Sequence, residues 1–222
     1  MFQMDAIETE IAVDTTKQRA HRSLGVAALI PAVNPGEDLI ALVHELHELG
    51  FAPLILIDDG SDDSSREVFD VLSSMPGVDV LRHLANLGRG NALRTGFNHF
   101  LLNHFDCAGI VTIDADGQHS SEDALAVAEM LLRNPKKLVL GCRVLDGIPW
   151  ASKLDNMFTR SFLWVLAGKR ISDTQTRLRG ISRSAIQQMI ALDSERYEFE
   201  MGMLINSSRF ADDIVEQRIH TI

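Results

Sequence analysis

Short apolar runs alternate with amphipathic segments along most of the chain. The apolar runs predict buried β-strands at residues 26–30, 53–57, 78–81, 109–113 and 138–140. Segments with apolar residues at helical spacing predict helices at residues 39–49, 61–74, 91–103 and 121–133. Strands that are apolar throughout and alternate with helices are typical of a parallel sheet covered on both sides. The pattern therefore predicts an α/β fold, with a Rossmann-like, mostly parallel sheet and helices on both faces.

The composition is that of a single globular domain. The chain has 222 residues, of which 45% are hydrophobic and 23% are charged. We expect the domain to span residues 23–222 and to follow a mobile, polar tail at residues 1–22. The sequence shows neither a secretory signal nor an apolar stretch of membrane-spanning length. Cys107 and Cys142 lie far apart without ligand spacing, which favours reduced thiols in a cytosolic protein.

Charge is distributed unevenly along the chain. Residues 1–132 carry 7 Lys/Arg and 21 Asp/Glu, a net charge of −14, whereas residues 133–183 carry 11 and 3, a net charge of +8. A basic segment within an acidic protein indicates an anionic partner, although a solvated face that balances the acidic half remains an alternative. Nucleic acid is not expected as that partner, because the segment lacks interleaved aromatic residues and the whole chain has a net charge of −10.

Two acidic clusters follow predicted strands, where open α/β sheets bind their ligands. The first is Asp58-Asp59-Gly60-Ser61-Asp62-Asp63. Its serine and later aspartates suit the start of a helix, but capping explains only one residue of the Asp58-Asp59 pair. Acidic side chains in this position can instead accept hydrogen bonds from a base or a ribose.

The second cluster is Asp114-Ala115-Asp116-Gly117-Gln118-His119. Two carboxylates and an amide oxygen suit a hard divalent cation, so we expect Asp114, Asp116 and Gln118 to bind Mg²⁺ or Mn²⁺. His119 is a less favoured fourth ligand, and we expect it beside the site or at the surface. A third segment, Asn86 to Ala92, has two glycines at a helix start, and its Arg89 is suited to a phosphate.

The order of these pieces resembles glycosyltransferase family 2, which has the GT-A fold, and within it the polyprenyl-phosphate sugar transferases related to dolichyl-phosphate mannosyltransferase. The resemblance covers residues 24–222. It rests on seven motifs: Leu29-Ile-Pro-Ala-Val-Asn34, Ile57-Asp-Asp-Gly-Ser61, Asn86-Leu-Gly-Arg-Gly-Asn-Ala92, Asp114-Ala-Asp-Gly-Gln-His119, Gly141-Cys-Arg143, Asp173-Thr-Gln-Thr-Arg-Leu-Arg-Gly180 and Arg196-Tyr-Glu-Phe-Glu-Met201.

The resemblance implies a nucleotide-sugar donor and a role for each matching residue. Asp114 and Asp116, with Gln118, would hold the metal on the donor pyrophosphate, and Arg143 would contact a donor or acceptor phosphate. The candidates for nucleotide binding are Pro31, Val33, Glu37, Ile57, Asp59, Arg89 and Ala115. Val33 and Pro35 replace the tyrosine and glutamate that the family usually has, and Glu37 lies two residues further on.

The resemblance also implies a metal-dependent, inverting transferase. A cation held by Asp114 and Asp116 would stabilise the charge that develops on the leaving nucleotide diphosphate. A polyprenyl phosphate acceptor is already anionic and would need cations rather than a base, for which Arg143, Lys153, Arg177 and Arg179 are candidates. A saccharide hydroxyl acceptor would instead need a carboxylate to remove its proton.

A lipid acceptor would place the protein at a membrane surface. The apolar and aromatic residues 156–167 suit either an interfacial helix or a core helix. We expect a peripheral protein at the cytoplasmic face of the membrane. Because residues 217–222 resemble a strand cut short and similar sequences continue, we also expect the native protein to have a C-terminal membrane domain outside this chain.

Two other functions would also use a nucleotide site on an α/β sheet. A sugar nucleotidyltransferase should have a glycine-rich, basic loop after its first strand, which residues 31–37 lack. A non-catalytic module that binds nucleotide sugars stays open because of the altered motif at Pro31. Turnover of a donor would distinguish it from an enzyme.

Overall fold

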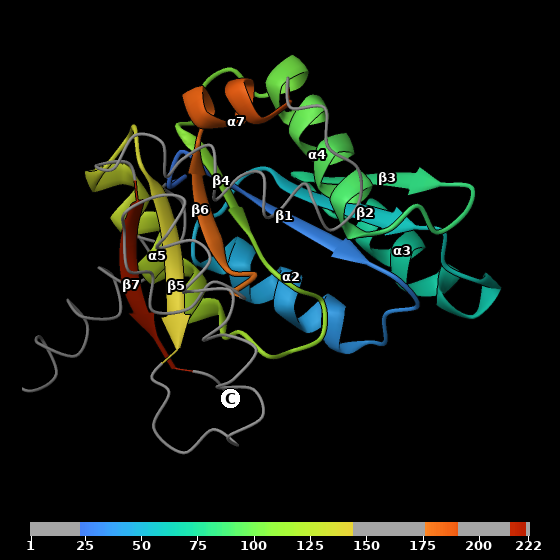
Figure 1. Cartoon of the computed structure of the whole chain (residues 1–222). Helices are drawn as coiled ribbons and strands as arrows, with labels where there is room; N and C mark the ends of the chain where they lie inside the picture. The colour runs from blue at the N-terminus through green and yellow to red at the C-terminus, as the bar shows by residue number, and fades with distance from the viewer. Residues whose placement is uncertain (1–22, 144–175, 191–213, 221–222) are drawn as a thin grey trace, which may run out of the picture.

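The computed structural model describes residues 23–143, 176–190 and 214–220 (Figure 1). They form a seven-stranded sheet in the order β3-β2-β1-β4-β6-β5-β7. The strands are β1 (Val26–Ala32), β2 (Leu54–Asp59), β3 (Val78–His83), β4 (Gly109–Thr112), β5 (Leu138–Arg143), β6 (Arg179–Ser182) and β7 (Ile214–Ile219). β6 runs antiparallel to both of its neighbours and the other pairings are parallel. The predicted mostly parallel sheet is confirmed.

Helices cover both faces of this sheet. They are α2 (Asp38–Glu48), α3 (Arg66–Ser73), α4 (Arg89–Asn103), α5 (Ser121–Arg133) and α7 (Arg183–Ile190), with a short 3₁₀ helix, η1, at Asp63–Ser65. Figure 1 shows α4 and α7 on one face and α2, α3 and α5 on the other. In this part of the chain, no helix is long and apolar enough to cross a membrane.

Alternate residues of β1 supply the two cores. Val26, Ala28 and Ile30 are buried against the core under α2, α3 and α5. Ala27 and Leu29 are buried in the second core, under α4 and α7. Because successive strand residues point to opposite faces, an uninterrupted apolar run is what a central strand with helices on both sides requires.

The strand β6 was not predicted from the sequence, and β7 begins three residues before the strand-like segment expected at residues 217–222. β6 is only four residues long and contains a charged residue, a glycine and a serine, so no apolar run marks it. It is nevertheless fully buried, and a side chain at Gly180 would lie 3.0 Å from Cγ1 of Val127 on α5. Gly180 therefore lets α5 pack closely over this strand.

Several predictions concern residues outside the described part of the chain. These are the N-terminal tail at residues 1–22, the cation at Lys153 and the apolar segment at 156–167.

Candidate active site

The candidate site is built from loops at the carboxyl edge of the parallel strands. The segments after β1, β2 and β4 lie there, together with the first turn of α4 and the residues that lead into β6. The polar clusters that the sequence analysis singled out are in these segments. The fold therefore brings them to one edge of the sheet, as predicted.

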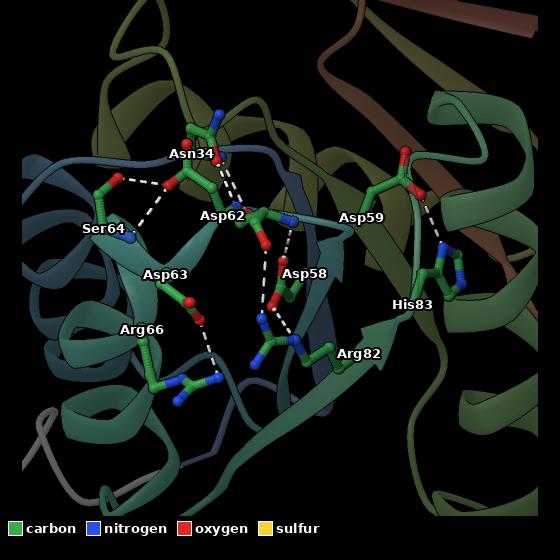
Figure 2. A network of polar contacts seen from close by, with 10 residues as sticks. Asn34, Asp58, Asp59, Asp62, Asp63, Ser64, Arg66, Arg82 and His83 are labelled. Atoms are coloured by element: carbon green, nitrogen blue, oxygen red, sulfur yellow. Dashed lines mark hydrogen bonds and ion pairs between the residues drawn. The ribbon is translucent and has the colours of Figure 1, made fainter.

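Asp59, the last residue of β2, is almost completely buried. Its Oδ1 accepts a hydrogen bond from the backbone amide of Leu87 and its Oδ2 accepts one from that of Gly88, each at 2.9 Å. On its other side, Nδ1 of His83 lies 2.7 Å from Oδ1 (Figure 2). The carboxylate thus fastens the loop before α4 to the end of β2. Its expected contact with a ribose stays a prediction.

Asp58 is buried as well and has a different set of partners. It accepts a hydrogen bond from the amide of Ser61 at 2.8 Å and forms an ion pair with Nε of Arg82 at 3.0 Å (Figure 2). Gly60, between the turn residues, has a φ of +74°, and a Cβ there would lie 2.2 Å from the carbonyl carbon of Ala85. The two acidic residues and this glycine together let the Ala85 loop pass directly over the turn after β2.

Asn34 joins the loop after β1 to the loop after β2. Its backbone amide donates a hydrogen bond to Oγ of Ser61 at 2.9 Å. Its side-chain oxygen accepts a hydrogen bond from the backbone amide of Asp62, also at 2.9 Å. Asn34 has a φ of +48°, a backbone conformation that asparagine tolerates better than most residues. Sequence reasoning missed this link, as it missed Arg82 and His83, because partners that are distant in the chain leave no local pattern.

Asp114 lies between two arginines. Nη1 of Arg89, in the first turn of α4, pairs with its Oδ1, and Nη1 of Arg177 lies 3.2 Å from its Oδ2. The aspartate is only 6% exposed, whereas the side chain of Arg177 is 50% exposed. Oγ1 of Thr112 donates to the carbonyl of Arg177 at 2.8 Å, which anchors that arginine to β4. Residues from three separate predicted motifs therefore meet at one carboxylate.

The other half of this cluster faces solvent. Asp116 and Gln118 are exposed, and Oδ1 of Asp116 accepts a hydrogen bond from the amide of Gln118 at 3.1 Å. Gly117 between them has a φ of +74°, so the chain turns sharply after the aspartate. The cluster thus presents one buried and one exposed carboxylate two residues apart.

His119 is buried rather than at the surface. Burial lowers its pKa, although the nearby carboxylates of Asp114 and Asp116 oppose that shift. Its Nδ1 has no hydrogen-bond partner within the described ranges. The lowered pKa favours the neutral imidazole, which leaves the two carboxylates without a positive charge from this side chain.

The residues fit a hard divalent cation. Carboxylate and amide oxygens are the ligands that Mg²⁺ and Mn²⁺ prefer, and Asp114, Asp116 and Gln118 offer such oxygens within five residues. The countercharges of Asp114 in this structure are the guanidinium groups of Arg89 and Arg177. A divalent cation bound to Asp114 would take the place of one of these groups as its countercharge.

The remaining predicted residues lie at varied depths around this edge. Val33 and Glu37 are exposed, Pro31, Ala115 and Arg143 are partly buried, and Ile57 is fully buried in the core under α4. Arg179 is buried in β6, where its Nε donates to the carbonyl of Thr176 at 2.8 Å. Their roles in binding donor or acceptor stay predictions.

Comparison with known proteins identifies the family. The sequence model described as glycosyl transferase family 2 matches residues 27–190, about three quarters of the chain. The chain belongs to glycosyl transferase family 2. The family resemblance drawn from the seven motifs is thereby confirmed. The matched range includes Asp59, Arg89, Asp114 and Arg177, so the site described above lies within the part of the chain that matches the family.

This family 2 chain is similar to two curated relatives and to one solved structure. The UDP-N-acetylglucosamine–dolichyl-phosphate N-acetylglucosaminyltransferase of Methanococcus voltae is 28% identical, over 87% of this chain and 84% of that protein. The undecaprenyl-phosphate 4-deoxy-4-formamido-L-arabinose transferase of Sodalis glossinidius is 27% identical, over 74% of this chain and 51% of that protein.

The solved structure is glucosyl-3-phosphoglycerate synthase from Mycobacterium tuberculosis, in complex with Mn²⁺, UDP and glucosyl-3-phosphoglycerate. It superposes with a TM-score of 0.68 at 19% identity and covers 91% of this chain and 71% of that one. The predicted GT-A fold is confirmed by this likeness.

Proposed function

We propose that this family 2 transferase moves a sugar from a UDP- or GDP-linked donor to a polyprenyl phosphate, with Mg²⁺ or Mn²⁺ as cofactor. The observation that carries the proposal is the placement of Asp114 between Arg89 and Arg177 at the carboxyl edge of the sheet. A carboxylate for a cation and two guanidinium groups for phosphates are the components that a reaction between two phosphorylated substrates requires.

The chemistry divides between the two kinds of charge. A divalent cation on Asp114, Asp116 and Gln118 would supply charge to the leaving nucleotide diphosphate. Arg89, released from Asp114, would contact the donor phosphates from the first turn of α4, where the helix dipole also favours an anion. The two substrates' phosphates would thus be held by cations on opposite sides of one carboxylate.

Arg177 is the candidate for the acceptor phosphate. Its side chain is half exposed, and its backbone is fixed to β4 through Thr112. A phosphate acceptor is already an oxyanion near neutral pH, so a nearby cation is more useful to it than a general base. Arg143, Lys153 and Arg179 are further candidates in the same basic segment.

The relatives support the choice of a lipid phosphate over a saccharide hydroxyl. Both curated relatives are named for transfer to a polyprenyl phosphate, one dolichyl and one undecaprenyl. We therefore infer that this chain acts at the cytoplasmic face of a membrane as a peripheral protein.

Transfer of a labelled sugar into a solvent-extractable lipid tests the proposal directly. UDP- and GDP-sugars are supplied with a short polyprenyl phosphate, with Mn²⁺ or with a chelator, to wild type and to Asp116→Ala. Metal-dependent labelling with one donor, lost in Asp116→Ala and kept in Asp63→Ala, is the expected result. Asp63 is a suitable control because its side chain is 87% exposed at the start of η1.

Other outcomes would revise the proposal. Labelling of a saccharide but not of the lipid would favour a hydroxyl acceptor. Thermal stabilisation by a donor without any transfer would favour a binding module that lacks catalysis, because a ligand specific to the native state raises its melting temperature.

A further inference from the structure

Two histidines and an aspartate form a cluster at the edge of the sheet away from the candidate active site. Asp79 is the second residue of β3, His99 lies in the last turns of α4, and His104 ends that helix. The 15 residues of α4 span roughly 22 Å, and Arg89 of the active site is at the other end of the helix. The cluster is therefore separate from the carboxylates of Asp114 and Asp116.

The three side chains converge on one point. Nε2 of His99 and Nε2 of His104 each lie 2.8 Å from the same oxygen, Oδ2 of Asp79. One ligand atom from each residue lies within 4.8 Å of the other two. In a tetrahedral zinc site with bonds of about 2.0–2.1 Å, ligand atoms are separated by roughly 3.3 Å. The observed arrangement needs only small side-chain movements to reach that spacing.

The surrounding residues hold these ligands in place. His104 has non-helical backbone angles, which lets its ring meet that of His99 although the two are five residues apart. The guanidinium group of Arg183 on α7 binds the carbonyls of His104 and Cys107, and it lies 4.4 Å from the ring centre of Phe100. The turn that carries His104 is thus anchored from a second helix.

Asn103 can set the tautomer of one ligand. Its side-chain amide lies 3.2 Å from Nδ1 of His99 and donates to the carbonyl of the same residue at 2.9 Å. A metal-binding histidine carries its proton on the ring nitrogen that faces away from the ion, where an oxygen usually accepts it. Binding of an ion at Nε2 of His99 would therefore require the Asn103 side chain to move away from Nδ1 and leave that proton to water.

We propose that Asp79, His99 and His104 bind a borderline transition-metal dication, Zn²⁺ in the first instance. Two imidazole nitrogens and one carboxylate favour Zn²⁺ or its neighbours over Mg²⁺, which prefers oxygen ligands only. The histidine side chains are 22% exposed and that of Asp79 is 34% exposed. Solvent can thus reach the cluster and complete the coordination with water. The ion would join the C-terminal end of α4 to β3.

Zinc titration of the whole protein in excess Mg²⁺ tests the inference. Mg²⁺ occupies the oxygen ligands of the candidate active site, so that the remaining zinc binding reports on the cluster. We expect one zinc per chain and a higher melting temperature on zinc addition, both lost in His99→Ala and in His104→Ala. Both effects should persist in Asp116→Ala and in His44→Ala/His47→Ala, which removes an exposed histidine pair on α2.

Cobalt gives a second measurement that needs no variant. Co²⁺ bound in a four-coordinate site with two imidazoles absorbs strongly in the visible range, whereas six-coordinate Co²⁺ on oxygen ligands absorbs weakly. A strong visible band in wild type is expected. Only weak absorption, no zinc binding in excess Mg²⁺, or undiminished zinc binding in folded His99→Ala and His104→Ala would each overturn the proposal.

Discussion

Asp59 and Gly88 are 29 residues apart in the chain, yet Oδ2 of the aspartate accepts a hydrogen bond from the glycine amide at 2.9 Å. The same carboxylate accepts from the amide of Leu87. An acceptor with two oxygens therefore fixes two successive backbone amides directly before α4. Arg89 is the next residue, so this contact also fixes the position of the backbone from which the Arg89 side chain reaches Asp114.

Asp59→Asn should destabilise the fold. Asparagine keeps one acceptor oxygen and replaces the other with an amide group, so one backbone donor at Leu87 or Gly88 loses its partner. Leaving a buried donor unsatisfied costs about 1–3 kcal/mol in free energy of unfolding. Urea denaturation measures the loss. Asp63→Asn, a change of the same chemistry at an exposed side chain, should stay within about 0.5 kcal/mol of wild type. Equal losses in the two variants would contradict the buried role of Asp59.

Gly60→Ala should cost more than Gly25→Ala. Both glycines have a similar positive φ, +74° and +69°, so alanine meets a similar backbone penalty of roughly 1–2 kcal/mol at each. Only at Gly60 would the added Cβ also collide with the backbone of the Ala85 loop, because no atom lies within 4 Å at Gly25. The difference in free energy of unfolding between the Gly60→Ala and Gly25→Ala variants measures the energetic cost of the collision. A difference near zero would mean that the loop moves aside without cost.

Arg89 and Asp114 should be energetically coupled. Removing one partner of a buried ion pair costs about 3–5 kcal/mol, and we expect roughly 1–3 kcal/mol for Arg89→Ala because Arg177 still faces the carboxylate. Asp114→Ala combined with Arg89→Ala should therefore cost less than the sum of the single changes, as a double-mutant cycle would show. Arg66→Ala, which removes an exposed partner of Asp63, should change stability by less than about 1 kcal/mol. Simple additivity at Arg89 and Asp114 would argue against the pairing.

The Cys107 thiol should react slowly at neutral pH. Burial raises its pKa above the ordinary value of 9.0, and Asp106 adds to the shift while Arg183 opposes it. The folded protein favours the neutral thiol of Cys107 more than the unfolded chain does. The resulting contribution to the free energy of unfolding is therefore present below about pH 9 and is lost as the pH rises further. Iodoacetamide labelling followed by mass spectrometry should give a midpoint above 9.0 in the native protein and a lower one in urea. Fast native labelling at pH 7 would contradict the raised pKa.

Sequence patterns predicted one half of the sheet far better than the other. β1, β2 and β4 each contain an apolar run because both faces of those strands are buried, and such runs are visible without knowledge of their partners. β6 is buried as completely, but its sequence is Arg-Gly-Ile-Ser. The glycine allows close packing against α5, and the arginine binds the carbonyl of Thr176. Neither interaction can be predicted from the hydrophobicity of the segment itself.

The candidate site shows the same division. Asp114, Asp116 and Gln118 stand within five residues, so the chain itself displays them as a group. The pairing of Arg89 and Arg177 with Asp114 joins residues 25 and 63 positions away, and only the folded sheet brings them together. The cluster of Asp79, His99 and His104 went unnoticed for the same reason, since its histidines do not have the spacing of one helical face.

The position of β6 between β4 and β5 has a consequence for biosynthesis. A nascent chain that has emerged only as far as β5 lacks the strand that separates β4 from β5, so the edge of β4 stays without its final partner until residue 182 is made. Unpaired strand edges bind other strands readily, and such long-range pairings form slowly. Arg177 arrives on the same late segment. The growing polypeptide is therefore exposed to aggregation until the edge of the sheet that carries the candidate site becomes complete.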